Sequence, residues 1–121
     1  MNQFRFRDWK VYSDTQALFT ILLKISSVLP KEYRFSLGEQ LIRAGLSIVL
    51  NIAEGSGKHS AKETCRFFDI ALGSAYEVLA CCDSLRNNDL LGTKELLDIE
   101  TRIDSICRQL GGLKKKFLEK A

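Results

Sequence analysis

Apolar residues recur every three or four positions in four separate stretches of this chain, which is the period of a helix with one buried face. The pattern predicts helices over residues 8–29, 37–54, 61–86 and 94–119. The last stretch is the most regular, because its apolar residues alternate steps of three and four: Leu96, Ile99, Ile103, Ile106, Leu110, Leu113 and Phe117. Such a seam is typical of helices that pack side by side at a small crossing angle.

Local signals predict where these helices begin and end. Ser13, Ser36 and Ser60 are each followed three residues later by Gln or Glu, the capping-box pattern of a helix start. Pro30 is expected to stop the first helix, since the residue before a proline is pushed out of the α region. The Gly55–Gly57 segment is expected to stop the second helix with a glycine in the left-handed conformation.

The expected helices are joined by short connections, the first over residues 31–35. Short connections make sequential helices antiparallel neighbours. The length of 121 residues fits one domain, and the 45% hydrophobic and 27% charged fractions are those of globular proteins. The sequence therefore predicts a single all-α domain over residues 1–121, an up-down-up-down antiparallel four-helix bundle.

The helix over residues 37–54 is apolar on two faces. One face can be covered by the bundle core, and the other needs a neighbouring helix or another subunit. Gly45 would cost about 1 kcal/mol relative to alanine in a helix interior, so a close backbone contact is expected there. The second face predicts an oligomer interface, formed by Ile42, Leu46, Val49 and Ala53 and widened by Leu50.

The same helix carries a narrow polar stripe that runs into Gly55. The stripe consists of Gln40, Arg43, Ser47, Asn51 and Glu54, and the next helix has a matching line of Glu63, Arg66, Ile70, Ser74 and Glu77. Antiparallel pairing predicts that Arg43 lies near Glu77, and Glu54 near Glu63 or Arg66. The structural interpretation is a buried Arg43–Glu77 ion pair, with Asn51 satisfying helix ends. The functional alternative is that Arg43, Asn51 and Glu54 line a ligand or nucleic-acid surface.

Basic residues gather at both ends of the chain although the net charge is only +3. We define an N-terminal basic cluster as Arg5, Arg7 and Lys10, and a C-terminal basic cluster as Lys114, Lys115, Lys116 and Lys120. Such clusters can attract phosphates. Lys114, Lys115 and Lys116 follow one another with no aromatic residue between them, so we expect phosphate contacts without base stacking and with little sequence specificity.

Catalytic and metal chemistry have weak support in the residues. Glu54, His59 and Glu63 could supply acid–base groups near the Gly55–Gly57 turn, but no nucleophile motif, phosphate loop or metal-ligand spacing accompanies them. We therefore expect a non-enzyme with no metal and no cofactor. The four cysteines are expected to be reduced and packed: Cys65, Cys81, Cys82 and Cys107. Together with the lack of a signal peptide or membrane-spanning stretch, they predict a cytoplasmic protein.

Several of these segments resemble a known family. Residues 40–55 read QLIRAGLSIVLNIAEG, residues 68–74 read FDIALGS, and residues 6–12 read FRDWKVY; Ser60, Glu77 and Pro30 also fit. The chain resembles the four-helix-bundle family encoded in intervening sequences of bacterial 23S ribosomal RNA. Gly45 departs from the usual alanine, and Leu41-Ile42 is more apolar than usual.

The resemblance implies a protomer that assembles as a ring-shaped homopentamer, with no established catalytic activity. It also links the chain to the accessory variability determinants of diversity-generating retroelements, which form barrel-like pentamers and bind nucleic acid and a reverse transcriptase. We therefore expect a non-catalytic homo-oligomeric scaffold that binds RNA or DNA through phosphates, as an accessory to a reverse transcriptase or to ribosomal RNA. The alternative is a scaffold for protein–protein interaction alone.

Overall fold

Four long α-helices make up most of residues 3–120, the part of the chain that the computed structural model describes. They are α1 (Lys10–Val28), α3 (Glu39–Ser56), α4 (Ala61–Asn87) and α5 (Thr93–Glu119). Residues 3–120 contain no β-strand, which confirms the all-α class; residues 1, 2 and 121 of the predicted domain lie outside the described residues. None of the helices in residues 3–120 has the length and apolar character needed to cross a lipid bilayer.

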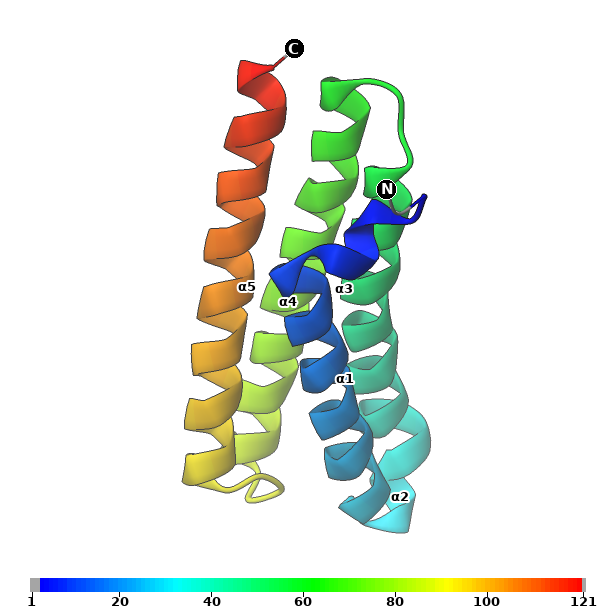
Figure 1. Ribbon diagram of the computed structural model, residues 1–121. Helices are drawn as coiled ribbons and strands as arrows, with labels where there is room; N and C mark the ends of the chain where they lie inside the picture. The colour runs from blue at the N-terminus through cyan, green and yellow to red at the C-terminus, as the bar shows by residue number, and fades with distance from the viewer. Residues whose placement is uncertain (1–2, 121) are drawn as a thin grey trace.

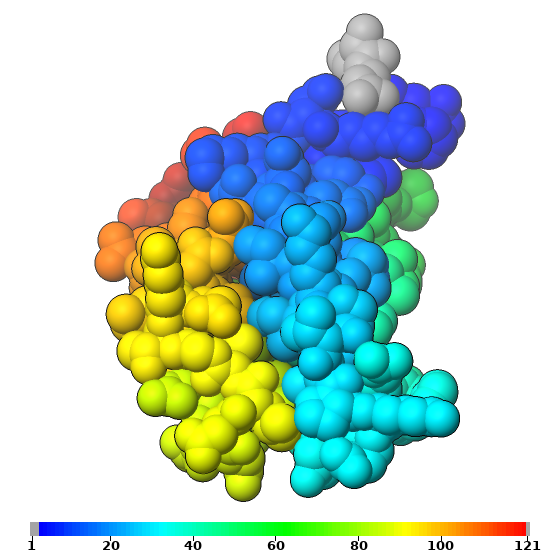
Figure 2. Space-filling model, turned by 90° about the horizontal axis from the view of Figure 1, so that it is seen from below, coloured from blue at the N-terminus to red at the C-terminus, as the bar shows by residue number. Residues whose placement is uncertain are grey.

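The four long helices lie side by side, and successive ones run in opposite directions (Figure 1). α3 packs against both α1 and α4, while α5 packs against α4 and less extensively against α1. Viewed from below, α1 lies between α5 and α3 (Figure 2). The segment from residue 3 to the start of α1 and the C-terminal end of α5 lie at the same end of the molecule (Figure 1).

One hydrophobic core joins all four long helices. Each contributes fully buried side chains, among them Leu18 and Leu22 of α1, Ile48 and Ile52 of α3, Phe68 and Val78 of α4, and Ile99 and Ile106 of α5. Gly45 of α3 meets α1 so closely that a Cβ atom there would lie 2.6 Å from Leu22 Cδ1. This confirms the close approach expected from a glycine inside a helix.

Two of the three predicted capping boxes are absent. Ser13 lies inside α1, which begins after the extended backbone of Trp9. Ser36 lies inside the π-helical turn η2 (Arg34–Gly38) and donates to Tyr33 O. Both predictions are wrong because the chain is already helical before these serines. Ser60 forms the predicted cap, accepting from the backbone N–H of Glu63 at 3.1 Å.

The ends of α3 also differ from the prediction. Residues 31–35 are helical, since α2 (Lys31–Tyr33) and η2 lead directly into α3. At the other end, Gly55 and Ser56 belong to α3, and the capping residue Gly57 has a φ of −92°. The left-handed glycine prediction is therefore wrong; among residues 3–120, the positive φ belongs to Asp89, after α4.

Candidate nucleic-acid interface

Two residues of the polar stripe, Gln40 and Ser47, join α3 to α4. Gln40 Nε2 donates to Glu77 Oε2 at 2.8 Å, and the hydroxyls of Ser47 and Ser74 lie 2.7 Å apart. Asn51 Nδ2 donates to both the carbonyl and the hydroxyl oxygen of Ser47. These bonds run between neighbouring helices or within α3, which favours the structural interpretation of the stripe.

The buried Arg43–Glu77 ion pair predicted for the stripe is wrong. Arg43 is exposed and lies 3.6 Å from Glu39 on its own helix, while the carboxylate of Glu77 accepts from Gln40. Asn51 bonds to Ser47 one turn earlier instead of satisfying a helix end. Gln40, one turn before Arg43, therefore makes the contact with Glu77, and within residues 3–120 Arg43 forms no buried ion pair.

At the end of the stripe, Gly55 allows α3 and α4 to come close together. The hydroxyl of Thr64 donates to Gly55 O at 2.9 Å, and a Cβ atom at Gly55 would lie 3.0 Å from Phe67 Cβ and 3.2 Å from Thr64 O. A larger side chain would push these helices apart. Gly55 thus serves the packing of the turn that connects α3 to α4.

The environment of Glu63 argues against its use as a general acid. Glu54 lies 3.9 Å from Lys58, and Glu63 accepts from Arg66 at 2.9 Å. The hydrogen bond to Glu63 and, to a lesser extent, the charge of Glu54 raise the pKa of Arg66, so Glu54 and Arg66 lie near each other as predicted, although the ion pair of Arg66 is with Glu63. The hydrogen bond from Arg66 lowers the pKa of Glu63, the opposite of what a general acid needs. In residues 3–120, no three His, Cys, Asp or Glu side chains are placed to hold a metal ion.

The second apolar face of α3 is only partly available to a neighbouring subunit. Val49 is 5% exposed within the protomer, so its prediction as an interface residue is wrong. Leu46 and Leu50 are 39% and 54% exposed, and Ile42 and Ala53 are partly buried. The exposed apolar surface is therefore narrower than the sequence predicted and centres on the two leucines.

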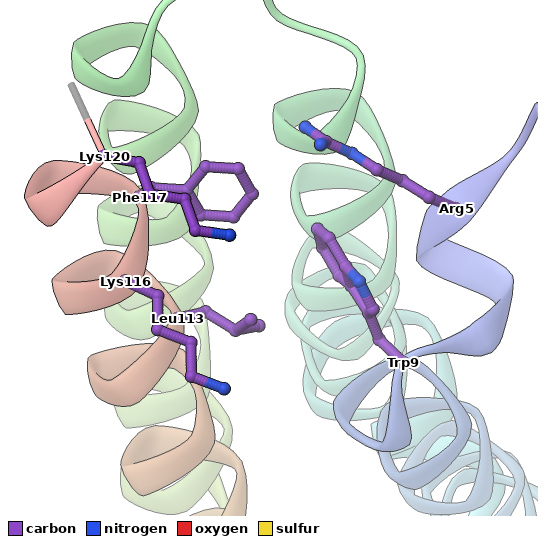
Figure 3. Close-up of a pocket in the computed structure, with 6 residues that line it drawn as sticks. All are labelled: Arg5, Trp9, Leu113, Lys116, Phe117 and Lys120. Atoms are coloured by element: carbon purple, nitrogen blue, oxygen red, sulfur yellow. The ribbon is translucent and has the colours of Figure 1, made fainter.

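The two basic clusters meet at one end of the molecule. Figure 3 shows side chains from α5 pointing toward side chains from the N-terminal segment across a pocket of about 260 Å³. We call it the terminal pocket; it is lined by Arg5, Trp9, Leu113, Lys116, Phe117 and Lys120. A second cavity of about 350 Å³ shares Trp9, Leu113 and Lys116 with it and extends to Lys10. The antiparallel arrangement thus places members of both clusters around one surface hollow.

Arg5 is fixed in place by its contacts. Its Nε and Nη2 atoms donate to Ser56 O at 3.2 and 2.9 Å. Its guanidinium carbon lies 5.8 Å from the ring centroid of Trp9 and 5.0 Å from that of Phe117, within cation–π range. Because Ser56 is the last residue of α3, a cation there also opposes the negative end of the helix dipole.

The remaining basic residues are placed differently. Lys114 pairs with Asp69, and Lys10 lies 2.6 Å from Asp14. Arg7 lies over the ring of Phe4, 5.5 Å from its centroid. Lys115 is exposed and lines neither of the two cavities. Arg5, Lys116 and Lys120 are therefore the members that the fold gathers at the terminal pocket.

Aromatic rings accompany these cations, an arrangement that was not predicted from the sequence. The ring centroids of Trp9 and Phe117 lie 6.2 Å apart, and each packs on Phe68, at 5.9 and 6.0 Å. The expectation that no aromatic platform lies beside the terminal lysines does not hold in the folded chain, because Trp9 comes from the opposite end of the sequence. Phe117, directly after Lys116, was the one local signal of this arrangement.

Comparisons with known proteins show a family match for the sequence and a solved structure with a similar fold. A family model described as 23S rRNA-intervening sequence protein matches residues 7–112. The solved structure of a protein of unknown function, from the S23 ribosomal protein family of Bacteroides thetaiotaomicron, is similar with a TM-score of 0.80. The two sequences are 20% identical, and the alignment covers 87% of this chain and 98% of the other, so the likeness concerns the fold. None of the curated protein sequences matches this chain.

Proposed function

The chain belongs to the 23S rRNA-intervening sequence protein family, and we propose that it is a non-catalytic homo-oligomeric scaffold that binds RNA or DNA through phosphate contacts. The observation that carries the proposal is the convergence of Arg5, Lys116 and Lys120 on the terminal pocket. These residues come from the two ends of the sequence, and the fold brings their charges together on one surface.

The charges at the terminal pocket are available to phosphates. Within residues 3–120, no carboxylate forms a salt bridge with Arg5, Lys116 or Lys120. Lys116 and Lys120 are exposed and one helical turn apart, so their ammonium groups can act on the same bound chain. Contacts of this kind release counterions from the nucleic acid and make binding depend on salt.

The oligomeric part of the proposal is supported by Leu46 and Leu50. They are exposed apolar side chains one turn apart on α3, with the partly buried Ile42 beside them. Contiguous apolar surface of this kind often marks an interface, and closed symmetry buries it without forming filaments. A ring would also multiply the terminal pocket. The number of five subunits, and a reverse transcriptase or ribosomal RNA as partner, come from the family resemblance alone.

Binding is tested by reversing the charges at the pocket. The Lys116→Glu, Lys120→Glu double variant should lose most of its affinity for fluorescently labelled structured RNA and duplex DNA at low salt, measured by anisotropy. Lys114 is left unchanged because it pairs with Asp69. The control is Lys24→Glu, Lys94→Glu, which makes the same charge change at two exposed lysines elsewhere. If the wild-type protein binds neither ligand at low salt, the proposal fails and the protein-interaction scaffold remains.

Assembly is tested by measuring mass in solution with light scattering. The wild type should be larger than a protomer, and Leu46→Glu with Leu50→Glu should dissociate it. Leu97→Glu, at a leucine of α5 that is 57% exposed, provides a matched control and should leave the mass unchanged. A wild-type monomer at micromolar concentration would contradict the oligomeric part of the proposal.

A further inference from the structure

The terminal pocket is lined by two aromatic rings, and their packing on a buried phenylalanine fixes their orientation. Phe68 of α4 is fully buried, and both Trp9 and Phe117 pack against it edge to face. The planes of Trp9 and Phe117 are inclined by 67° to each other. Trp9 and Phe117 are both partly exposed. Part of each ring therefore packs on the core, and the exposed part lines the pocket. The aromatic lining therefore exists before any ligand binds.

Positive charge surrounds this aromatic lining. Arg5 is held over both rings by its bonds to Ser56 O, and Lys116 and Lys120 project from α5 toward the same space (Figure 3). The Cβ atoms of residues four apart on a helix are about 5–6 Å apart, and a lysine side chain adds several ångströms of reach. The two ammonium groups can therefore approach separate phosphates of one strand.

The pocket continues into a groove along the seam between α1 and α5. The neighbouring cavity shares Trp9, Leu113 and Lys116 with the terminal pocket and reaches Lys10 and Gln109. Asp8 also lines this second cavity, so its far part is less favourable to phosphates. A nucleic-acid strand that crosses Lys116 would thus place its phosphates near Lys116 and Lys120. An uncharged part of the strand would then contact the aromatic lining.

We propose that the terminal pocket takes an unpaired nucleobase of a single-stranded RNA or DNA, with Lys116 and Lys120 on the adjoining phosphates. This inference rests on the nucleic-acid binding proposed above and names the form that is bound. A nucleobase is a flat ring system attached to a chain of negative charges, which matches aromatic side chains bordered by cations. Arg5 adds a guanidinium plane, on which bases also stack.

The size and position of the pocket favour a single strand over a duplex. Its volume of about 260 Å³ is below the roughly 300–1,000 Å³ of sites for drug-sized ligands, so it suits one base at a time. A base inside a duplex has both faces covered and reaches a recessed site only after leaving its pair and its stack. The family match ends at residue 112, before the α5 residues of the pocket. The inference therefore concerns this chain's own C-terminal residues.

Trp9 makes the inference directly observable, since it is the only tryptophan in the chain. A fluorescently labelled oligodeoxythymidine is added at low salt, and the anisotropy of the label and the fluorescence of Trp9 are followed together. We expect the fluorescence of Trp9 to be quenched along the same binding curve as the anisotropy rises. A strand of the same length without bases has the same phosphates and should bind more weakly without quenching.

The Phe117→Leu variant removes an aromatic face but keeps an apolar side chain against the core. Loss of one stacked base typically weakens binding by about 5- to 150-fold, so oligodeoxythymidine should bind that much more weakly, and the baseless strand nearly unchanged. Phe35→Leu is the matched control, because Phe35 is 82% exposed and lines neither the terminal pocket nor the groove. Circular dichroism checks that both variants keep the wild-type helix content.

The outcomes separate this inference from the proposed function. If the single strand binds without quenching Trp9 and Phe117→Leu binds it like the wild type, the base pocket is refuted while phosphate-mediated binding stands. Equal affinity for duplex and single strand would also refute it. If neither form of nucleic acid binds at low salt, both the proposed function and this inference fail.

Discussion

Gly45 and Gly73 are glycines inside long helices, but their surroundings are opposite. A Cβ atom at Gly45 of α3 would lie 2.6 Å from Leu22 Cδ1 and 3.3 Å from Phe19 Cδ1. A Cβ atom at Gly73 of α4 would have no such neighbour within 4 Å. Replacing each glycine with alanine should therefore separate two effects on stability. Both variants gain the helix-forming preference of alanine, and only the Gly45 variant meets crowding where α1 packs on α3.

The expected magnitudes follow from these distances. Alanine stabilises a helix interior by about 0.5–1 kcal/mol relative to glycine, so Gly73→Ala should raise the free energy of unfolding by that amount. Gly45→Ala gains the same term but places a methyl group about 1 Å inside the usual 3.5–4.0 Å carbon contact. Leu22 is 0% exposed and cannot move into solvent, so overpacking should cost about 1–3 kcal/mol.

Urea denaturation followed by circular dichroism measures both variants against the wild type. All samples need the same protein concentration, because the stability of an oligomer depends on it. The Gly45→Ala protein should be less stable than the Gly73→Ala protein by about 1–3 kcal/mol. If both substitutions stabilise the fold equally, the close contact between α3 and Leu22 is refuted.

Two further predictions concern titratable groups. The hydrogen bond from Lys10 lowers the pKa of Asp14 in the folded protein. The ionised Asp14 carboxylate therefore stabilises the fold fully above the ordinary carboxyl pKa of about 3.9, and this stabilisation disappears as the pH falls through the lower pKa of the folded protein. In urea denaturation, Asp14→Asn should therefore lower the free energy of unfolding at pH 7 but not in strong acid. An equal loss of stability at both pH values would contradict the lowered pKa of Asp14. Burial raises the pKa of Cys82 to about 12, so iodoacetamide at pH 8 should label this thiol only after unfolding. Mass spectrometry showing Cys82 labelled in the native protein would refute its burial.

The long helices could be predicted from the sequence because their apolar period reflects one shared core. The predicted ends lie within two residues of the observed ones for all four. Ser60 could be predicted as a cap because the chain before it is not helical. The turn η2 could not, since its π-helical backbone has no distinctive residue pattern and carries the helix through Ser36.

The side-chain pairs were harder to predict than the helices. Gln40, one turn before Arg43, reaches Glu77, and this choice depends on a small shift of α3 along α4 that periodicity does not determine. The sequence located basic residues at both ends of the chain. Their meeting with Trp9 and Phe117 follows from the packing of α1 and α5, so only the fold reveals the terminal pocket.

The salt dependence of nucleic-acid affinity tests most directly whether Lys116 and Lys120 contact phosphates. The slope of the logarithm of the binding constant against the logarithm of salt concentration reports the number of such contacts, at about 0.7–0.9 per phosphate. Lys116→Gln with Lys120→Gln should weaken binding and reduce this slope by about one for each lysine in the interface. Lys24→Gln with Lys94→Gln should leave both affinity and slope unchanged. An unchanged slope in the first variant, or equal losses in both, would contradict phosphate binding at the terminal pocket.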